Sequence, residues 1–450
     1  MKHVDILVIG GSAAGLTAAI TARRHYPEKQ TFILRKEEQV LIPCGIPYIF
    51  GTVGSPEKNL IPDKVLAQNQ VDLLVDEATE IDRDKNCVIT ANGESVGYDR
   101  LVLATGSLPA MPPIPGFELE NVFPIYKDVA HLHQMQEALQ GISDLVIVGG
   151  GFIGVEFADE CKKSLGANVS IVEMLPHCLM LAYDEEFCVH AENLLRERDI
   201  EPVTNTRVKR IVGTDSVEGV ELEDGNTIPA QAVILGIGAA ANVTLAEQAG
   251  LQIGPTGGIG VDRTMRTSDE HIYACGDCAE KVSFFGGRPS GLKLASIATA
   301  EARIAAANLF GTRRESIGTV GVWSTAIGET AFATAGLTER LAKRHGYYHV
   351  VGTAEAPNRH PGGMPGAHNM KVKLVFEKRT GIILGGQVMG DSAAGEVINA
   401  ISACIQQRMT AEDVAMFQTG THPALTASPV SYQFVNAAEA AIAALRETSS

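Results

Sequence analysis

The chain has 450 residues, which is enough for about three domains at ~150 residues each. Hydrophobic residues make up 45% of it and charged residues 20%, the ordinary balance of a protein with large buried cores. The formal net charge of −16 argues against nucleic acid binding, which needs a basic surface, and no apolar stretch reaches the ~18 residues that span a bilayer.

The sequence also argues against a signal peptide and against a scaffold held by disulfides. A strand-like segment starts directly after Met1-Lys2-His3, which leaves no room for a signal peptide. The eight cysteines show no zinc-binding spacing, and the closest pair, Cys275 and Cys278, has no matching second pair, so we expect most of them to be buried, reduced and inert. These features predict a cytoplasmic protein.

Strand-like and helix-like segments alternate from residue 4 to about 315, the pattern of βαβ units and a parallel sheet. The apolar run 4–9 leads into a glycine-rich turn, a helix and a second strand at 30–34. Residues 145 to about 240 repeat this order, with strands at 145–148 and 169–172. Between the two repeats, the segment from Pro109 to Pro115 contains four prolines and indicates a crossing between domains.

The pattern changes at about residue 322. Segments 347–352, 371–376 and 382–389 alternate as antiparallel strands do, and helices are expected at 393–407 and 431–445. We therefore predict an α/β chain with two Rossmann-like dinucleotide-binding domains and a C-terminal α+β domain.

The first candidate site is the turn Gly10-Gly11-Ser12-Ala13-Ala14-Gly15. Backbone N–H groups and the helix dipole at such a turn bind a pyrophosphate. Ser12 replaces the middle glycine, and its small size suits the position. An acidic residue is expected about 20 residues further on to bind the ribose, but Arg35 ends the second strand. Either Glu37 takes this role from a shifted register, or the ribose is held in another way.

The second turn fits the dinucleotide pattern more closely. Gly149, Gly151 and Gly154 have the required spacing, and Glu173 ends the following strand, where a carboxylate accepts two ribose hydroxyls. Residues 174–178 contain no Arg or Lys to receive a 2′-phosphate. The second site is therefore predicted to prefer NADH, with NADPH as the alternative.

Between the two turns lies Cys44, in the segment from Ile42 to Tyr48 that is rich in proline and glycine. Free backbone N–H groups near the sulfur are expected to lower the thiol pKa and favour the nucleophilic thiolate. Position 49 is Ile, so there is no nearby CxxxxC disulfide partner. The redox partner of Cys44 is therefore external, either a substrate thiol or an oxygen atom bound as sulfenate.

These motifs resemble the FAD-dependent pyridine nucleotide–disulfide oxidoreductases, over essentially the whole chain. The similarity is to the branch with one redox cysteine, which contains coenzyme A disulfide reductase, NADH oxidase, NADH peroxidase and persulfide reductases. The segments that carry it are Gly10–Gly15, Cys44–Tyr48, Ala104-Thr105-Gly106, Gly149–Gly154 with Glu156, and Ile272–Asp277.

The resemblance implies roles for residues that spacing alone does not assign. Asp277 would bind the FAD ribityl chain, and Leu294 and Ala295 would approach the flavin. Ile153, Glu156 and the turn from Gly236 to Gly238 would surround the nicotinamide. The predicted cofactor-binding residues are Gly10, Ser12, Ala14, Gly15, Arg35, Thr105, Gly106, Asp277, Leu294, Ala295, Gly149, Gly151, Ile153, Gly154, Glu156, Glu173 and Gly238.

Departures from the family pattern bear on the acceptor. Oxidase and peroxidase members carry a histidine in the first turn, where this chain has Ala13, which disfavours both readings. Coenzyme A disulfide reductases place Asn before the cysteine, where this chain has Pro43. Thr17 and Arg24 do match positions that contact coenzyme A in those enzymes, so a coenzyme A thiol is one candidate substrate.

A proton donor is also needed to release a thiolate. Thr421-His422-Pro423 is similar to the His-Pro that reaches across the dimer in two-cysteine disulfide reductases, although Ala427 replaces the usual glutamate. We expect His422 of a second subunit to serve as acid or base, with His360 as the next candidate and an ordinary surface histidine as the alternative.

The sequence thus predicts a homodimeric flavoprotein that passes electrons from NADH through FAD and Cys44 to a disulfide, persulfide or polysulfide, with no metal. The alternatives are an NADH oxidase, a redox-sensing or electron-transfer subunit with a protein partner, and a module that binds only a flavin. The predicted domains are 1–112 and 244–320 for FAD, 113–243 for NAD, and 321–450 for dimerisation.

Overall fold

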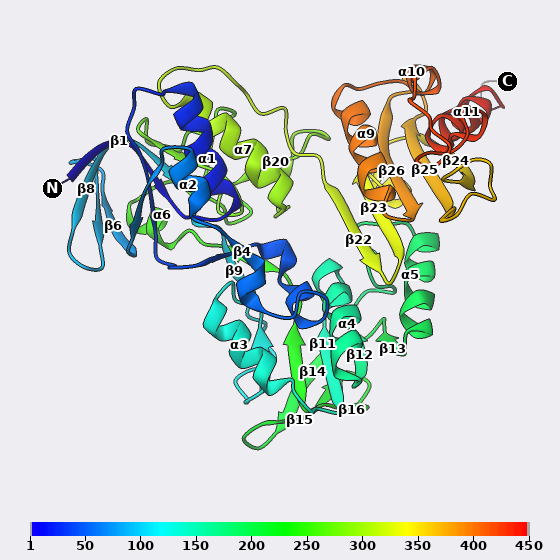
Figure 1. Cartoon of the computed structure of the whole chain (residues 1–450), viewed down its shortest axis with the longest axis horizontal. Coiled ribbons are helices and arrows are strands. Elements are labelled where there is room, and N and C mark those ends of the chain that lie inside the picture. The colour runs from blue at the N-terminus through cyan, green and yellow to red at the C-terminus, as the bar shows by residue number, and fades with distance from the viewer. Residues whose placement is uncertain (1, 448–450) are drawn as a thin grey trace.

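The structure is a computed structural model that describes residues 2–447. Residue 1 and residues 448–450, at the outer ends of the first and last predicted domains, lie outside the described part. Three large sheets divide the chain into three units (Figure 1). We call them the first, second and third unit, in the order in which the chain enters them.

The first unit is built on a seven-stranded sheet in the order β5-β2-β1-β8-β7-β6, with β19 paired to β8. Helices α1 (Ala13–His25) and α7 (Ala295–Asn308) pack on each other through small residues such as Ala18 and Ala302. The chain leaves this sheet after β8 and returns only at β19. The strands are β1 (Lys2–Ile9), β2 (Thr31–Arg35), β5 (Asp72–Val75), β6 (Ala78–Asp82), β7 (Cys87–Thr90), β8 (Ser95–Leu103) and β19 (Ile272–Ala274).

The second unit lies between these two halves and repeats the strand–turn–helix order. Its parallel sheet runs β10-β17-β11-β12-β13, and a smaller antiparallel sheet, β14-β15-β16, is attached. The elements are β10 (Val122–Pro124), α3 (Val129–Ala138), β11 (Asp144–Val148), α4 (Phe152–Leu165), β12 (Asn168–Val172), α5 (Glu185–Glu197), β13 (Ile200–Val203), β14 (Val208–Gly213), β15 (Val217–Leu222), β16 (Thr227–Pro229) and β17 (Ala232–Leu235).

The third unit is an antiparallel sheet in the order β22-β23-β26-β25-β24. Helix α9 (Ala394–Gln406) contacts β23 and β26, and α11 (Gln433–Glu447) contacts β24 and β25. The predicted class, two Rossmann-like units followed by an α+β unit, is confirmed. The strands are β22 (Val322–Ile327), β23 (Thr330–Gly336), β24 (His349–Pro357), β25 (Asn369–Glu377) and β26 (Ile383–Gly390).

Two strands of this sheet had no clear signal in the sequence. β22 and β23 consist largely of small and hydroxylated residues, which do not alternate strongly in hydropathy. Their pairing is long: every residue of β22 has a partner in β23. The turn between them, at Gly328 and Glu329, places β22 against the second unit.

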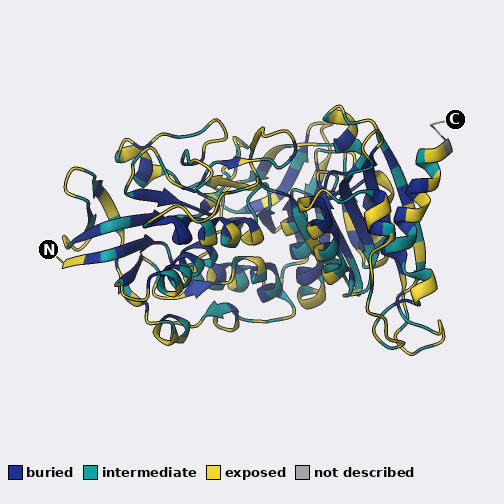
Figure 2. Ribbon diagram, turned by 90° about the horizontal axis from the view of Figure 1, so that it is seen from above, coloured by how far each residue is buried: buried dark blue, intermediate teal, exposed yellow. Residues whose placement is uncertain are grey.

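Short elements complete the chain. Figure 2 shows buried residues along the strands and exposed residues on the outer faces of the helices. No helix among residues 2–447 is long and apolar enough to cross a membrane. The short elements are β3 (Val40–Leu41), η1 (Pro43–Gly45), η2 (Pro47–Phe50), η3 (Pro56–Asn59), β4 (Leu60–Ile61), α2 (Lys64–Gln68), β9 (Ser107–Pro109), β18 (Ala239–Ala241), α6 (Thr244–Gln248), β20 (Lys281–Val282), β21 (Pro289–Ser290), α8 (Glu339–Arg344), α10 (Ala411–Ala415) and η4 (Pro429–Ser431).

The three units meet around α4. The segment with η1 and η2 extends from the first unit toward the second, and η2 contacts α4 (Figure 1). β22 of the third unit also contacts α4. The α4 helix therefore carries residues that face both neighbouring units.

Candidate functional site

The first glycine turn is shaped by one glycine in the left-handed region and by one close backbone approach. Gly10 has φ of 111°, in the left-handed region that favours glycine. A Cβ atom added to Gly15 would collide with the carbonyl oxygen of Gly10, so α1 begins directly against the turn. Among the described residues, no side chain caps the start of α1 at Ser12. Its first N–H groups are therefore available to a phosphate.

Arg35 lies beneath this turn rather than beside it. A Cβ atom on Gly11 would be 2.5 Å from Cδ of Arg35. The guanidinium donates to both carboxylate oxygens of Asp63 at 2.7 and 2.8 Å and to the carbonyls of Glu37 and Glu38, each at 2.8 Å. Arg35 thus holds the loop that leads toward Cys44. Its role in binding a cofactor stays a prediction.

The ribose alternative that involves Glu37 also stays open. Within residues 2–447, the Glu37 carboxylate makes no hydrogen bond or ion pair. It is therefore free to accept bonds from a ligand, in contrast to Asp63.

A second side of the first site is formed after β8 and β19. Gly106 has φ of 73° and open space around the position of a Cβ, and the Thr105 hydroxyl donates to the Asn242 carbonyl at 2.6 Å. The Asp277 carboxylate accepts from the Ser107 hydroxyl at 2.7 Å and lies 3.8 Å from Nζ of Lys127.

A buried ion pair fixes the turn before Asp277. The Gly276 N–H donates to Glu301 at 2.9 Å, and Lys281 donates to the Gly276 carbonyl at 2.6 Å. Nζ of Lys281 is 3.5 Å from the Glu301 carboxylate, and both side chains are buried. Burial raises the pKa of Glu301 to about 7. Sequence reasoning missed this pair because its members are distant in sequence and match no local motif.

Leu294 and Ala295 lie at the start of α7. Leu294 is the residue before the first turn of the helix, and Ala295 opens it. Ala295 is exposed in this structure. The resemblance placed both residues near a flavin, and that placement stays a prediction.

The second glycine turn repeats the first in backbone geometry. Gly149 has φ of 106°, and a Cβ on it would be 2.6 Å from the Gly236 carbonyl oxygen. A Cβ on Gly154 would collide with the Gly149 carbonyl oxygen. A Cβ on Gly151 would meet no atom within 4 Å, and this open space is the cradle that a pyrophosphate would fill.

Glu173 closes the second turn from below. Its carboxylate accepts the N–H of Gly150 and the N–H of Leu175, each at 2.7 Å. The side chain is buried, and the two backbone bonds leave further lone pairs for hydroxyl groups. Nearby, Ile153 is 46% exposed, and Gly238 has φ of 100° with open space around it. These residues fit a dinucleotide.

Cys44 lies in η1 at the junction of the units. The described part contains all eight cysteines, and Cys44 is exposed whereas the other seven are buried. Asn59 holds this segment by donating to the Ile42 carbonyl at 2.9 Å, and its amide fills the space where a side chain at Gly45 would lie.

The prediction that the surroundings lower the pKa of the Cys44 thiol is wrong: the neighbouring protein groups raise it. Partial burial raises the pKa, and the negative charges of Glu156 and Asp277 raise it further. Only Lys127 and a local backbone bond act in the opposite direction. The sequence suggested a turn rich in N–H donors but gave no sign that two carboxylates distant in sequence, Asp277 of the first unit and Glu156 of the second, act on Cys44.

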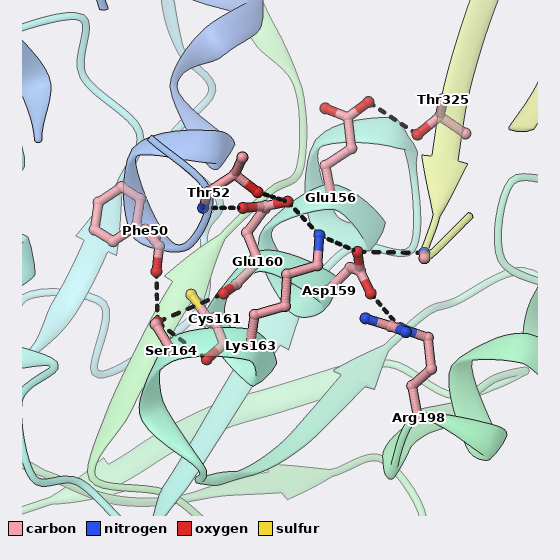
Figure 3. A network of polar contacts seen from close by, with 11 residues as sticks. Phe50, Thr52, Glu156, Asp159, Glu160, Cys161, Lys163, Ser164, Arg198 and Thr325 are labelled. Atoms are coloured by element: carbon pink, nitrogen blue, oxygen red, sulfur yellow. Dashed lines mark hydrogen bonds and ion pairs between the residues drawn. The ribbon is translucent and has the colours of Figure 1, made fainter. Parts of the chain in front are cut away.

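Glu156 lies on α4 and faces β22 of the third unit (Figure 3). Its carboxyl group accepts a hydrogen bond from the Thr325 hydroxyl at 2.9 Å. Burial raises the pKa of Glu156 to about 7, the bond from Thr325 lowers it, and Glu160 raises it. Glu156 therefore changes charge near neutral pH.

His422 is exposed and its ring is oriented by backbone. The Ala424 N–H donates to Nδ1 of His422 at 3.2 Å, and the His422 N–H donates to the Thr426 hydroxyl at 3.0 Å. Because Nδ1 accepts, the neutral ring carries its proton on Nε2. Ala424 thus supplies the orienting group that Ala427 does not.

His360 contacts the same loop: Nδ1 of its ring lies 3.0 Å from the Thr426 carbonyl oxygen. No described contact within the chain joins either histidine to Cys44. Their catalytic roles stay predictions that concern a second subunit.

Thr17 and Arg24 lie two turns apart on α1 and so share one face of the helix. Arg24 is exposed and, in the described part of the chain, makes no hydrogen bond or ion pair. This face is open to a ligand, and no observation identifies the ligand.

Comparisons with known proteins agree with this geometry. The family model described as "Pyridine nucleotide-disulphide oxidoreductase" matches residues 4–302, and the dimerisation domain of the same family matches residues 322–431. An NADH oxidase of Methanocaldococcus jannaschii is 32% identical, covering 91% of this chain and 92% of that protein. An NAD(P)H coenzyme A polysulfide/persulfide reductase of Pyrococcus horikoshii is 31% identical with the same coverage.

A solved structure gives the same result in three dimensions. An NAD-dependent persulfide reductase from A. fulgidus superposes with a TM-score of 0.89 at 32% identity. The match covers 99% of this chain and 84% of that one.

Proposed function

Because the chain belongs to the pyridine nucleotide-disulphide oxidoreductase family, we propose that it is an NADH-dependent reductase of disulfide, persulfide or polysulfide sulfur that acts through Cys44. It is an oxidoreductase with FAD and NAD(H) as cofactors, and residues 322–431 are the family's dimerisation domain. The observation that carries the proposal is the exposure of Cys44 alone among eight cysteines, at the meeting point of three units.

In this scheme the cofactors supply the electrons, and Cys44 reacts with the sulfur substrate. When bound, the nicotinamide supplies a hydride and the flavin relays its two electrons. The Cys44 thiolate attacks the outer sulfur of a persulfide R–S–SH, forming Cys44–S–SH and releasing R–S⁻. Two electrons then break that S–S bond, regenerate the thiolate and release HS⁻. Protonation of R–S⁻ and HS⁻ completes R–S–SH + NADH + H⁺ → R–SH + H₂S + NAD⁺.

The residues around Cys44 have supporting roles in this scheme. Asn59 fixes the turn and so orients the sulfur. Glu173 and the turn from Gly149 to Gly154 would hold the nicotinamide dinucleotide, and Asp277 with Ser107 would hold the flavin side chain. The open face with Thr17 and Arg24 supports a substrate that carries phosphates, such as coenzyme A.

The assembly and its location are also proposals. A homodimer would bring His422 of the partner subunit, whose Nε2 carries the proton of the neutral ring, to the leaving thiolate. The eight free cysteines support a reducing, cytoplasmic setting.

The test uses the holoenzyme and the variant Cys44→Ser. We expect the variant to keep its FAD and its reduction by NADH under anaerobic conditions, and to lose turnover with coenzyme A persulfide and with polysulfide. Wild-type protein reduced by NADH should be reoxidised by these acceptors faster than by air. Undiminished sulfur reduction by Cys44→Ser would leave the flavin itself as the donor and end the proposal.

A second candidate is an NADH oxidase, supported by the relative from M. jannaschii that carries this name. In that function Cys44 would cycle through a sulfenate. The same reoxidation experiment separates the two, because the oxidase requires that air reoxidise the flavin fastest. Ala13, in the turn where other oxidases have histidine, argues for the sulfur acceptor.

A further inference from the structure

The segment between β12 and α5 connects the second glycine turn with the third unit. We call residues 179–184 of this segment the linking turn. Its backbone is closed on itself, because the N–H groups of Ala182 and Tyr183 donate to the Leu179 carbonyl at 3.0 and 3.2 Å. It ends at Asp184, directly before α5, and α5 lies beside β22 of the third unit (Figure 1). The linking turn is therefore one hydrogen-bonded piece that reaches from one unit to another.

The first end of the linking turn supports the second glycine turn. The Leu179 N–H donates to the Gly150 carbonyl at 2.8 Å. Gly150 is held from its other side by Glu173, which accepts the Gly150 N–H at 2.7 Å. A Cβ atom on Gly150 would lie 2.7 Å from Sγ of Cys178, the residue before the linking turn, so the two segments are in close contact. The position of Leu179 therefore helps to set the position of the Gly150 backbone.

The far end of the linking turn is held by the third unit through a buried carboxylate. Nζ of Lys373, on β25, lies 3.0 Å from the Asp184 carboxylate, and both side chains are buried. The Gln387 amide of β26 donates to the same carboxylate at 2.6 Å and accepts the Asp184 N–H at 2.7 Å. The N–H groups of Glu339 and Arg340, in the first turn of α8, donate to it at 3.1 and 3.2 Å. Three elements of the third unit thus converge on Asp184.

Two further contacts join the third unit to the linking turn. The guanidinium of Arg340, on α8, donates to the Met180 carbonyl. The Tyr183 ring packs edge-on against the Phe332 ring of β23, with centroids 6.1 Å apart, in an apolar cluster that both units share. The third unit therefore holds the linking turn at its start, in its middle and at its end.

We propose that Arg340 and Lys373 are positioning residues for the nicotinamide dinucleotide, and that they act through the linking turn on the Gly150 backbone. The proposal rests on the dinucleotide role proposed above for the second glycine turn and is independent of the sulfur acceptor. A backbone that is fixed before the ligand arrives does not have to be ordered on binding, so its support contributes to affinity. The third unit thus has a task besides dimerisation, because it holds the nucleotide-binding turn of its own chain.

The experiment measures dinucleotide binding without turnover. ADP-ribose, which carries the pyrophosphate and both riboses but no nicotinamide, is titrated into the oxidised holoenzyme in a calorimeter. Arg340→Met removes the bond to the Met180 carbonyl and should raise the Kd for ADP-ribose roughly three- to tenfold. Lys373→Met removes the cation beside Asp184 and should have at least as large an effect. FAD content should stay at the wild-type level in both variants, because the predicted FAD site lies in the first unit.

Steady-state kinetics and two further variants separate positioning from other effects. In both variants the KM for NADH should rise with little change in kcat, since the loss is in binding and not in the chemical step. Arg340→Lys keeps a cationic donor and should recover most of the affinity that Arg340→Met loses. Lys343→Met removes a positive charge from an exposed position of the same helix and should leave the Kd for ADP-ribose unchanged.

A third unit that only stabilises the fold would give a different result. The melting temperatures of Arg340→Met and Lys373→Met would then fall while the Kd for ADP-ribose stayed at the wild-type value, and this outcome overturns the proposal. Lys373 also pairs with Glu186 and Glu339, at 2.7 and 3.0 Å, so should Lys373→Met fail to fold, the titration of Arg340→Met decides alone.

The failure of this proposal is distinguishable from failures of the function proposed above. Wild-type protein that does not bind ADP-ribose would reject the dinucleotide role of the second turn and, with it, this inference. Equal Kd values in the wild type and the two variants would reject only the role of the third unit. Undiminished sulfur reduction by Cys44→Ser would reject the sulfur relay and leave the titration with ADP-ribose as it is.

Discussion

The two strand–turn–helix units share their backbone but differ in the side chains that close it. Gly10 and Gly149 have φ of 111° and 106°, and the helix starts at Gly15 and Gly154 make the same close approach to the turn. Beneath the second turn, Glu173 accepts two backbone N–H groups. Beneath the first, Arg35 turns away to Asp63. The two turns therefore share the backbone geometry that a pyrophosphate requires. They differ in the residue at the position that would hold the ribose, which is Glu173 in the second unit and Arg35 in the first.

The corresponding faces of the helices α1 and α4 also differ, in what they contact. Thr17 and Arg24 stand seven and fourteen residues after Gly10, and Glu156 and Lys163 stand at the same spacings after Gly149. In the second unit this face packs against η2 and β22. In the first unit it is open. This helix face therefore joins the three units in α4, whereas in α1 we propose that it contacts a substrate.

The largest expected effect comes from the shared part of the two turns. Gly15→Ala and Gly154→Ala each push a methyl group into a backbone carbonyl, which typically costs about 1–3 kcal/mol locally. We expect Gly15→Ala to be purified with little FAD, and Gly154→Ala to retain FAD while KM for NADH rises roughly tenfold or more. Flavin absorbance and steady-state kinetics measure the two effects.

A matched control for these variants is Gly395→Ala, near the start of α9, where the added Cβ meets no atom within 4 Å. It should change neither property. If Gly154→Ala lost FAD and Gly15→Ala did not, the assignment of the two turns would be reversed.

The next largest effect is expected on replacing the Glu173 carboxylate of the second unit. In Glu173→Gln, one of the two backbone N–H groups would face an NH₂ group in place of an acceptor, at a cost of about 1–3 kcal/mol. The specificity constant for NADH should fall roughly 10- to 100-fold, and that for NADPH should fall less. Glu201→Gln, an exposed change on β13, serves as the control. Equal specificity constants for NADH and NADPH in the wild type would contradict the predicted preference.

A smaller effect should separate the two roles open to Arg35. Arg35→Gln removes the guanidinium, whereas Asp63→Asn removes only its partly exposed partner. If Arg35 contacts FAD, as predicted, Arg35→Gln should weaken FAD binding clearly more than Asp63→Asn, whose ion pair contributes about 0–1 kcal/mol. Equal losses in the two single variants and in the double variant would mean that Arg35 only anchors the loop.

The comparison also shows what the sequence could and could not predict. The glycine turns, the strands beside them and the isolated Cys44 follow from local patterns, because backbone sterics determine them within a few residues. The ion pair of Lys281 with Glu301, the bond from Thr325 to Glu156 and the raised pKa of Cys44 arise between segments far apart in the chain. Alternation of hydropathy revealed β24, β25 and β26 but not β22, in which apolar and polar residues do not alternate.

The smallest expected effect concerns the open face of α1. Arg24 has no partner in the described chain, whereas Lys163, its counterpart in the second unit, is held by Asp159 and Glu160. Only Arg24 is therefore free to meet a substrate phosphate, and an exposed ion pair contributes about 0.2–1 kcal/mol. Arg24→Gln should raise KM for coenzyme A persulfide roughly two- to fivefold, leave kcat unchanged, and have no effect on inorganic polysulfide, which carries no phosphate. The effect should fade at high ionic strength, since both charges are exposed. An equal change with both acceptors would place Arg24 in a structural role and return the open face of α1 to an unassigned surface.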